Sequence, residues 1–241
     1  MRNLRKTDTE APKRADRDQL EKRTSKLHEE LLKLQYGLYK NKEYSVLIVL
    51  QGLDAAGKDS TIRSVFSGVN PMGTSVKSWK VPTEEEYGHD FLWRIHKHVP
   101  PKGMIHIFNR SHYEDVIVPI INKSISPKKV NRRYEYINYF ERLLKEENNT
   151  IIFKFFLHIS KSKQREKLEE RIYNPEKRWK HNPKDIEVNL KWNEYIKVYE
   201  KIIEKTEEAF PWHIVPADNK WYRNYLIANS LVKELKKHVK L

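Results

Sequence analysis

The chain contains no cysteine among its 241 residues. Disulfides and thiolate chemistry are therefore excluded, and the composition is compatible with a reducing compartment. The polar N-terminus, MRNLRKTDTEAPKRADRDQ, lacks the apolar core of a secretory signal. No run approaches the roughly 20 apolar residues of a membrane span. There is also no internal repeat and no low-complexity linker. Together these absences predict a soluble, cytoplasmic protein.

Acidic residues are fewer than basic ones: the chain has 33 Asp and Glu against 47 Lys and Arg, which gives a net charge of +14. Such a positive field suits nucleic acid, an anionic membrane surface or a highly phosphorylated substrate, and charge alone does not choose among them. With 38% hydrophobic residues, a chain of this length can bury one sizeable core. We expect a single globular domain with appendages.

The first 40 residues differ in pattern from the rest. Residues 1 to about 18 mix both charge signs with almost no large apolar side chains, which predicts a mobile arm. Five leucines then recur at helical spacing on one face: Leu20, Leu27, Leu31, Leu34 and Leu38. We interpret residues 1–40 as an arm and an N-terminal helix, and 41–241 as the main domain. A simple covering helix is one interpretation; the other is an interface, shared with the aromatic C-terminal tail, in a homo-oligomer (dimer or tetramer).

After residue 40, apolar runs alternate with helical patterns. The runs are short, rich in Val, Ile and Phe, and lack the alternation of a half-exposed sheet: 45–50, 75–79, 104–108, 150–159 and 212–215. Such runs are typical of buried parallel strands. The candidate helices between them cover 59–67, 84–96, 130–147 and 160–173, with Ser160 available as an N-cap. The pattern predicts an α/β fold in which ligands bind at the carboxyl ends of the strands.

A phosphate-binding loop follows the first predicted strand. Residues 52–58, GLDAAGK, fit the pattern G-x-x-x-x-G-K between a strand and a helix, which is the context that such loops require. Backbone N–H groups and the helix N-terminus favour phosphate oxygens, and Lys58 adds a full charge. An ordinary turn between strand and helix is the alternative.

Two carboxylates lie near this loop, where they would repel a bound polyanion. A carboxylate among phosphates is repulsive unless a divalent cation lies between them, so Asp54 predicts Mg²⁺, with Mn²⁺ as an expected substitute. Asp59 stands where the usual pattern has Ser or Thr, and we interpret it as complementing the helix dipole.

The third predicted strand leads into IFNRSHYEDV, residues 107–116. Beside the loop, Arg110 could neutralise phosphoryl charge, and Glu114 or Asp115 could serve as a metal ligand or base. The alternative is a surface ion pair between Arg110 and Glu114 at helical spacing.

A basic segment follows the fourth strand, over residues 160–185. It is rich in Lys and Arg, and two Asn-Pro pairs break its helical pattern. We predict a mobile lid that closes over phosphates and brings an arginine to the reacting group. A solvated charged face is the alternative.

These segments resemble the second polyphosphate kinase family, whose members move a phosphoryl group between inorganic polyphosphate and nucleotides. The matching stretches are 52–59, 109–114, 170–171 with 174–180, and the tail PWHIVPADNKWYRN at 211–224. The resemblance covers most of the chain after about residue 40. Asn109 departs from the family pattern, in which many relatives have Asp. This departure shifts the expected metal binding to Asp54.

The resemblance implies a P-loop kinase fold akin to thymidylate kinase: a three-layer α/β/α sandwich with about five parallel strands and a helical lid. It also implies a Mg²⁺-dependent phosphotransferase acting on AMP and ADP, with GMP and GDP as further purine acceptors. Glu114 is the expected determinant of AMP use. No nucleic acid and no membrane are expected as partners.

The expected site has three groups of residues. The catalytic residues are Asp54, Lys58, Arg110, Glu114 and Arg171, with Asp54 and Glu114 also as metal ligands. The phosphate-binding residues are Gly52, Ala55, Ala56, Gly57, Lys58, Asp59, Ser60, Arg63, Arg165, Arg178 and Lys180. The nucleotide-binding residues are Lys80, Asp90, Trp93, Arg94 and Asn109.

Two other functions fit parts of the sequence. An ATP-dependent P-loop kinase of a small metabolite would share the loop and the lid. A nucleic-acid-binding protein would explain the net charge and the aromatic residues.

Overall fold

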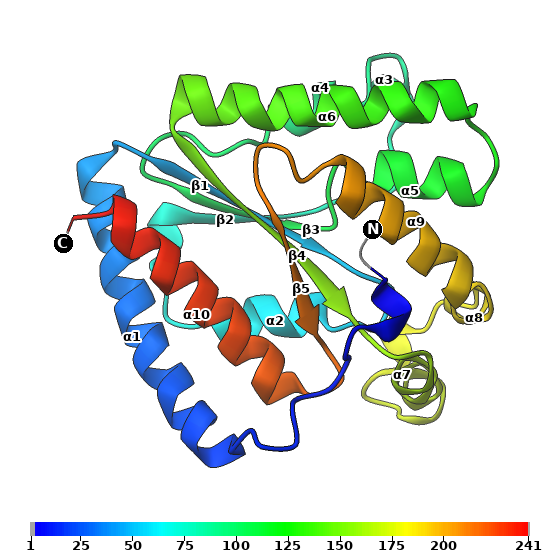
Figure 1. The fold of residues 1–241 in the computed structure, drawn as a ribbon, viewed down its shortest axis with the longest axis horizontal. Helices are drawn as coiled ribbons and strands as arrows, with labels where there is room; N and C mark the ends of the chain where they lie inside the picture. Colours follow the sequence, from blue (N-terminus) through cyan, green and yellow to red (C-terminus); the bar gives the residue numbers. More distant parts are fainter. Residues whose placement is uncertain (1–2, 241) are drawn as a thin grey trace.

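Five short apolar segments form one parallel sheet in the computed structural model, which describes residues 3–240 (Figure 1). The strands are β1 (Ser45–Gln51), β2 (Thr74–Ser78), β3 (Ile105–Asn109), β4 (Thr150–His158) and β5 (Trp212–Pro216). Their order across the sheet is β2-β3-β1-β4-β5, and every neighbouring pair is parallel. The five predicted strands and the α/β class are therefore confirmed. The loop after β1 begins at the centre of the sheet.

Burial along the strands follows their place in this order. The central strands β1 and β4 are buried at every position, because neighbours flank them and helices cover both faces. The edge strand β2 is largely exposed, with Val76 at 50% exposure, so the prediction of a buried strand is wrong there. An edge strand has a neighbour on one side only, and its apolar run is correspondingly short.

Helices cover the two faces of the sheet and make a three-layer sandwich (Figure 1). One layer contains α1 (Arg17–Asn41), α2 (Lys58–Val65) and α10 (Lys220–His238). The other contains α5 (Glu114–Ile121), α6 (Pro127–Asn148) and α9 (Trp192–Lys205). Among the helices of residues 3–240, none combines the length and the apolar composition that a membrane span needs.

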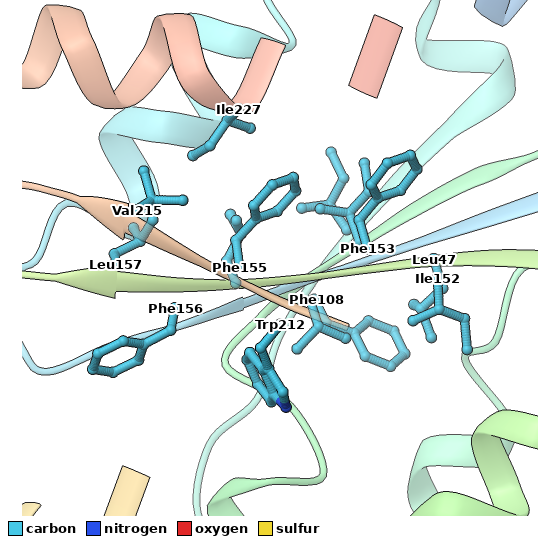
Figure 2. Packing of buried hydrophobic residues seen from close by; sticks show 14 of the residues in the cluster. Leu47, Phe108, Ile152, Phe153, Phe155, Phe156, Leu157, Trp212, Val215 and Ile227 are labelled. Carbon is cyan, nitrogen blue, oxygen red and sulfur yellow. The ribbon is translucent and has the colours of Figure 1, made fainter. Parts of the chain in front are cut away.

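The core lies on both sides of the sheet. Figure 2 shows Phe155 and Phe156 of β4 pointing to opposite faces, as the two-residue period of a strand requires. Phe155 packs on the side of Ile227 from α10, and Phe156 on the side of Trp212. All four side chains are nearly or fully buried. This double-sided packing holds the carboxyl ends of β1, β3 and β4 in fixed relative positions.

The predicted helix over 84–96 is interrupted. It forms two single-turn helices, α3 (Glu84–Tyr87) and α4 (Trp93–His96). Gly88 ends the first helix, and the Asp90 carboxylate accepts hydrogen bonds from the N–H groups of Leu92 and Trp93. A side-chain acceptor so close in sequence takes the backbone N–H groups that would otherwise form helical hydrogen bonds, so the helix is interrupted.

The segment after β4 has the predicted helical and broken character. It consists of α7 (Lys161–Tyr173), a 3₁₀ turn (Arg178–Lys180) and α8 (Lys184–Leu190). Ser160 caps α7 by accepting a hydrogen bond from the N–H of Lys163, as predicted.

The N-terminal segment is docked rather than free. Leu4 is fully buried; its N–H donates to Glu200, and its carbonyl accepts from His158 at 2.8 Å. Thr9 hydrogen-bonds Asp218 through both side chain and backbone. The prediction of a mobile arm is therefore wrong for residues 3–16, because one buried leucine and a row of backbone hydrogen bonds hold a polar segment. Residues 1 and 2 lie outside the described part of the chain.

The apolar face of α1 is covered within the same chain. Leu27, Leu31, Leu34 and Leu38 are buried in the core, and α1 packs along α10. This face is thus the predicted covering helix and is not available as a subunit interface.

Candidate active site

The loop between β1 and α2 adopts the backbone of a phosphate cradle. Gly52 and Gly57 have φ of +148° and +98°, and Ala55 has φ of +63°. A Cβ at Gly52 would lie 2.7 Å from the carbonyl oxygen of Leu157, so only glycine fits there. Lys58 opens α2 and folds back over the loop, donating to the carbonyls of Gly52 at 2.7 Å and Leu53 at 3.1 Å. The loop therefore has the shape and the cation that its sequence pattern predicts.

Arg110 is the centre of the charged cluster beside this loop. It follows β3 with φ of +65°, and its N–H donates to the carbonyl of Leu50 at the end of β1. Its guanidinium binds the carboxylate of Asp54 and lies 3.2 Å from that of Glu114. The ion pair between Arg110 and Glu114 that the sequence offered as an alternative is present, and Asp54 from the phosphate loop joins it to form a cluster of three charges.

The protonation behaviour of the cluster follows from its low exposure. Burial alone would raise the pKa of Asp54, but Arg110, Lys58 and Arg171 hold that pKa below its usual value. Burial would lower the pKa of Arg110, and Glu114 with Asp54 raises it instead. Burial, followed by repulsion from Arg110, lowers the pKa of Lys58 to about 8. The cluster thus holds a fixed guanidinium, an ionised Asp54 and a lysine that loses its charge in mildly alkaline solution.

A cavity of about 510 Å³ opens between the loop and the lid. Arg171 lines it from α7 and is held by an ion pair with Asp185 of α8 at 2.7 Å. The other lid side chains at this cavity are Lys167, Glu170, Lys177 and Lys180. The lid therefore brings an arginine to the cavity that the phosphate loop also lines.

Most of the predicted phosphate-binding residues meet at this cavity. Ala55, Gly57, Lys58, Asp59, Ser60, Arg63 and Lys180 line it, as does the predicted metal ligand Asp54. Asp59 also accepts a hydrogen bond from Asn109 at 2.7 Å, so it joins α2 to β3 in addition to its place at the helix start. Four predicted phosphate-binding residues do not line the cavity. Gly52 and Ala56 are buried within the loop. Arg165, which pairs with Glu169, and Arg178 are exposed. Their charges lie on the lid but outside this cavity.

The predicted nucleotide-binding residues separate into two groups. Lys80 and Asn109 line the cavity. Arg94 is 5% exposed and forms an ion pair with Asp115 at 2.9 Å, so a carboxylate of the protein already neutralises its charge. The Asp90 carboxylate accepts from the N–H groups of Leu92 and Trp93 at the start of α4, and Trp93 stacks on His89 with ring centroids 3.9 Å apart. The geometry gives no support to Arg94, Asp90 or Trp93 as ligands of this cavity.

Arg223 of α10 was not among the predicted site residues. Its side chain is 1% exposed, donates to the carbonyl of Ala56 and to Ser60 Oγ at 3.0 Å, and has no carboxylate within 4 Å among residues 3–240. Burial lowers its pKa to about 10. Lys167 of the lid lies nearby, and burial followed by Arg223 lowers the pKa of Lys167 to about 8. Both residues belong to stretches that the sequence singled out, but only the fold shows that they meet beside the loop.

A buried ion pair supports the turn that carries Arg110 and Glu114. Lys154 and Glu141 are fully buried and 2.7 Å apart, and Tyr113 donates to Glu141 at 2.7 Å. Tyr113 directly precedes Glu114, so the pair fixes the start of α5. The lysine inside the apolar run TIIFKFFLH was the one signal of this pair in the sequence.

No cluster of three or more Asp, Glu or His side chains arranged to hold a metal is present in residues 3–240. Asp54 and Glu114 both bind Arg110, and together they are too small a donor set to bind an ion alone. A Mg²⁺ ion that binds through one or two carboxylates and substrate phosphates fits such a set.

A phosphate loop at the centre of the sheet, faced by a lid that carries an arginine, places the chain among the P-loop kinases. Comparisons with known proteins narrow this class. Residues 14–240 match the polyphosphate kinase 2 (PPK2) family, and the chain belongs to it.

The similar proteins include two enzymes and one solved structure. The chain is 51% identical over 211 residues to the AMP/ADP-polyphosphate phosphotransferase of Meiothermus ruber, covering 87% of this chain and 78% of the relative. It is 39% identical over 226 residues to the ADP-polyphosphate phosphotransferase of Rhodopseudomonas palustris, covering 88% and 78%. The crystal structure of polyphosphate kinase 2 from Arthrobacter aurescens TC1 superposes with a TM-score of 0.94 at 34% identity, covering 99% of this chain and 87% of that one. These matches confirm the resemblance and favour neither a metabolite kinase nor a nucleic-acid-binding protein.

Proposed function

We propose that the protein is a polyphosphate-dependent nucleotide kinase that phosphorylates both AMP and ADP. The observation that carries this proposal is the charge of the cavity. Arg63, Lys80, Lys167 and Lys180 line it without a carboxylate within 4 Å among the described residues. A polymer with close to one negative charge per phosphate would supply the missing counter-charges along the whole cavity.

The residues at the loop would hold the reacting phosphates. Lys58 would exchange its two carbonyl partners for phosphate oxygens, which are stronger acceptors because they are ionised. Arg110 reaches the cavity from the end of β3 and Arg171 from the lid, and both would neutralise charge on the transferred group. Phosphoryl transfer depends on such positioning and charge stabilisation more than on covalent help.

We further propose that Mg²⁺ binds at Asp54 and Glu114, with Mn²⁺ as a substitute. The support is chemical: both side chains offer carboxylate oxygens, and the pKa of Asp54 is held low, so it stays ionised. When bound, the ion would neutralise negative charge on the reacting phosphates. Arg110 would keep both carboxylates aimed at the phosphates.

Glu114 is our proposed determinant of AMP use. Its carboxylate lies at the start of α5 and pairs with Arg110. AMP carries one phosphate fewer than ADP and is therefore the shorter acceptor. The Glu114 carboxylate would orient a metal ion or a water molecule next to it. The Meiothermus ruber relative is named for both acceptors.

Three further proposals concern partners and place. We propose no nucleic-acid and no membrane partner, because unpaired cationic side chains gather in a cavity matched to phosphate chains. A cytoplasmic location is proposed because AMP and ADP are cytoplasmic metabolites. We also propose that the chain forms a homo-oligomer, a dimer or a tetramer, because large apolar side chains of α6 such as Tyr139 and Leu143 are exposed.

The test is an acceptor and donor screen of the full chain. Polyphosphate or ATP is the donor, and AMP, ADP, GMP and GDP are the acceptors, with products separated by anion-exchange chromatography. We expect transfer from polyphosphate to AMP and ADP, a loss of about 100-fold or more in Asp54→Asn, and a selective loss of AMP use in Glu114→Asn. Glu169→Gln, an exposed carboxylate on α7, is the matched control.

Each claim has its own contradicting result. Reaction of ATP with small alcohols, without transfer from polyphosphate, would make the protein a metabolite kinase. Equal AMP use by Glu114→Asn and the unmodified protein would remove Glu114 as the determinant. Tight oligonucleotide binding that falls steeply with salt and survives Asp54→Asn would favour a nucleic-acid function.

A further inference from the structure

A single buried glutamine joins the phosphate loop to the lid. Gln164 lies in the first turn of α7 and is 0% exposed. Its side-chain N–H donates to the backbone carbonyl of Asp54 in the loop at 3.0 Å. Its side-chain oxygen accepts from the amide nitrogen of Asn189 on α8 at 3.0 Å. Both ends of this amide therefore have partners, one in the loop and one in the lid.

Asn189 fixes the direction in which the amide of Gln164 points. Asn189 is 6% exposed, and its side-chain nitrogen also donates to the carbonyl of Lys161 at 3.1 Å. That carbonyl can only accept, so the nitrogen of Asn189 faces it, and the same nitrogen requires the oxygen of Gln164 as its second acceptor. The nitrogen of Gln164 is thereby turned towards Asp54. The lid helices α7 and α8 are thus joined to each other and, through Gln164, to the loop.

The contact at Asp54 determines the direction of the next N–H group of the loop. A trans peptide is planar, so the carbonyl of Asp54 and the N–H of Ala55 point in opposite directions. Gln164 holds the carbonyl, and Ala55 lines the cavity. Ala55 has φ of +63°, which is unfavourable for a residue with a Cβ and persists only where surrounding contacts impose it. The hydrogen bond from Gln164 is such a contact.

We propose that Gln164 is a positioning residue for phosphoryl transfer, a role that rests on the proposed function. It holds the peptide between Asp54 and Ala55 in the conformation that binds phosphate, and Asn189 ties that conformation to the lid. Gln164 does not line the cavity, so it acts through the loop and not on the substrate. Without it, Ala55 is free to leave its unfavourable φ, and the loop N–H groups lose their alignment with the reacting phosphates.

The first experiment measures steady-state transfer from polyphosphate to ADP by the full chain. Gln164→Met keeps the approximate side-chain volume and removes both hydrogen bonds. We expect kcat to fall about tenfold or more, because the loop is misaligned, and KM for polyphosphate to change less than about twofold, because the cations of the cavity still attract the polymer. Gln35→Met, at another fully buried glutamine on α1, is the matched control and keeps kcat within about twofold. Thermal unfolding by circular dichroism checks that each variant is folded.

A double-mutant cycle tests the connection through Asn189. Asn189→Ala removes the lid end of the connection and leaves the glutamine in place, and we expect kcat to fall about threefold or more. In the double variant with Gln164→Met, kcat is expected to be no lower than in Gln164→Met alone, because Asn189 acts through Gln164. Two losses that simply multiply would show that Asn189 only packs α8 against α7, and would contradict the connection.

The second experiment needs no turnover and measures amide hydrogen exchange by mass spectrometry, with and without inorganic tripolyphosphate. Residues 185–190 of α8 do not line the cavity, so any slowing of their exchange by tripolyphosphate is transmitted through the protein. We expect tripolyphosphate to slow exchange both in residues 52–58 and in α8 of the unmodified protein, and the slowing in α8 to be lost in Gln164→Met.

The two experiments separate the role of Gln164 from the proposed function. Coupled slowing of exchange that depends on Gln164, in a protein that does not transfer phosphate from polyphosphate, would contradict the proposed function and support the connection between loop and lid. A kcat of Gln164→Met equal to that of Gln35→Met would overturn the role of Gln164. Slowing of exchange in α8 that is the same in Gln164→Met and in the unmodified protein would also overturn it.

Discussion

Two lysines at the cavity, the buried Lys58 and the partly buried Lys167, predict an alkaline limit to substrate capture. Burial lowers the pKa of Lys58 and of Lys167 to about 8, and both line the cavity that we assign to phosphates. Below this pH both ammonium groups are charged and attract polyphosphate. As the pH rises through 8 each loses its charge, so binding by the free enzyme weakens. The expected sign is a fall in kcat/KM for polyphosphate with rising pH.

The size of the effect follows from the two titrations. At pH 9, one unit above the pKa, about a tenth of each lysine is charged, so the requirement for both lowers kcat/KM about 100-fold relative to pH 7. Bound phosphates raise the pKa of a neighbouring ammonium, so kcat at saturation holds to higher pH. Initial rates of ATP formation from ADP, measured by chromatography over a pH range from about 6.5 to about 9.5, give both parameters.

Replacing one lysine by arginine separates the two groups. Lys167→Arg keeps its charge at all these pH values, so the fall at pH 9 is expected to shrink to about tenfold. Lys161→Arg, at an exposed lysine on the same helix and outside the cavity lining, is expected to leave the profile unchanged. A kcat/KM of the unmodified protein that stays level from about pH 7.5 to about pH 9.5 would show that neither lysine needs its charge for polyphosphate capture.

Two predictions concern stability, both measured by urea unfolding. Lys154→Met removes the lysine partner of the buried Glu141 carboxylate and is expected to cost about 3–5 kcal/mol, whereas Lys154→Met with Glu141→Leu recovers most of that loss. A single-variant cost below about 1 kcal/mol would show that the pair is not buried as described. Gly52→Ala meets the Leu157 carbonyl at 2.7 Å and is expected to cost about 1–3 kcal/mol more than Gly68→Ala, whose added Cβ has no atom within 4 Å. Equal costs for the two glycines would contradict the close approach at the loop.

The sequence was sufficient for features that depend on local pattern. The five strands and the phosphate loop are each contiguous, so apolar runs and glycine spacing are enough to find them. Arg110 and Glu114 were found because they follow a strand whose carboxyl end had to reach the loop. The pairing of Arg110 with Asp54 then followed from the sheet order, in which β3 is the neighbour of β1.

Features that depend on distant contacts were missed. The docking of the N-terminal segment rests on Leu4, and a single leucine in a polar stretch has no periodic signal. Arg223 approaches the loop from α10, 167 residues along the chain from Ala56. Asp90 and Arg94 were placed near the nucleotide by their position after β2. Asp90 instead accepts hydrogen bonds from the backbone two and three residues further on, and Arg94 pairs with the distant Asp115. Except for Asp90, tertiary contacts decide whether these residues bind a ligand or hold the fold.

The central claim is that the phosphoryl donor is inorganic polyphosphate, and ³¹P NMR tests it most directly. The full chain is incubated with long-chain polyphosphate, ADP and Mg²⁺, and the internal polyphosphate resonance and the nucleotide γ-phosphate resonance are followed together. We expect the polymer signal to fall as the γ-phosphate signal rises, and Asp54→Asn to stop both changes. An unchanged polymer signal beside active transfer from ATP to another acceptor would contradict it.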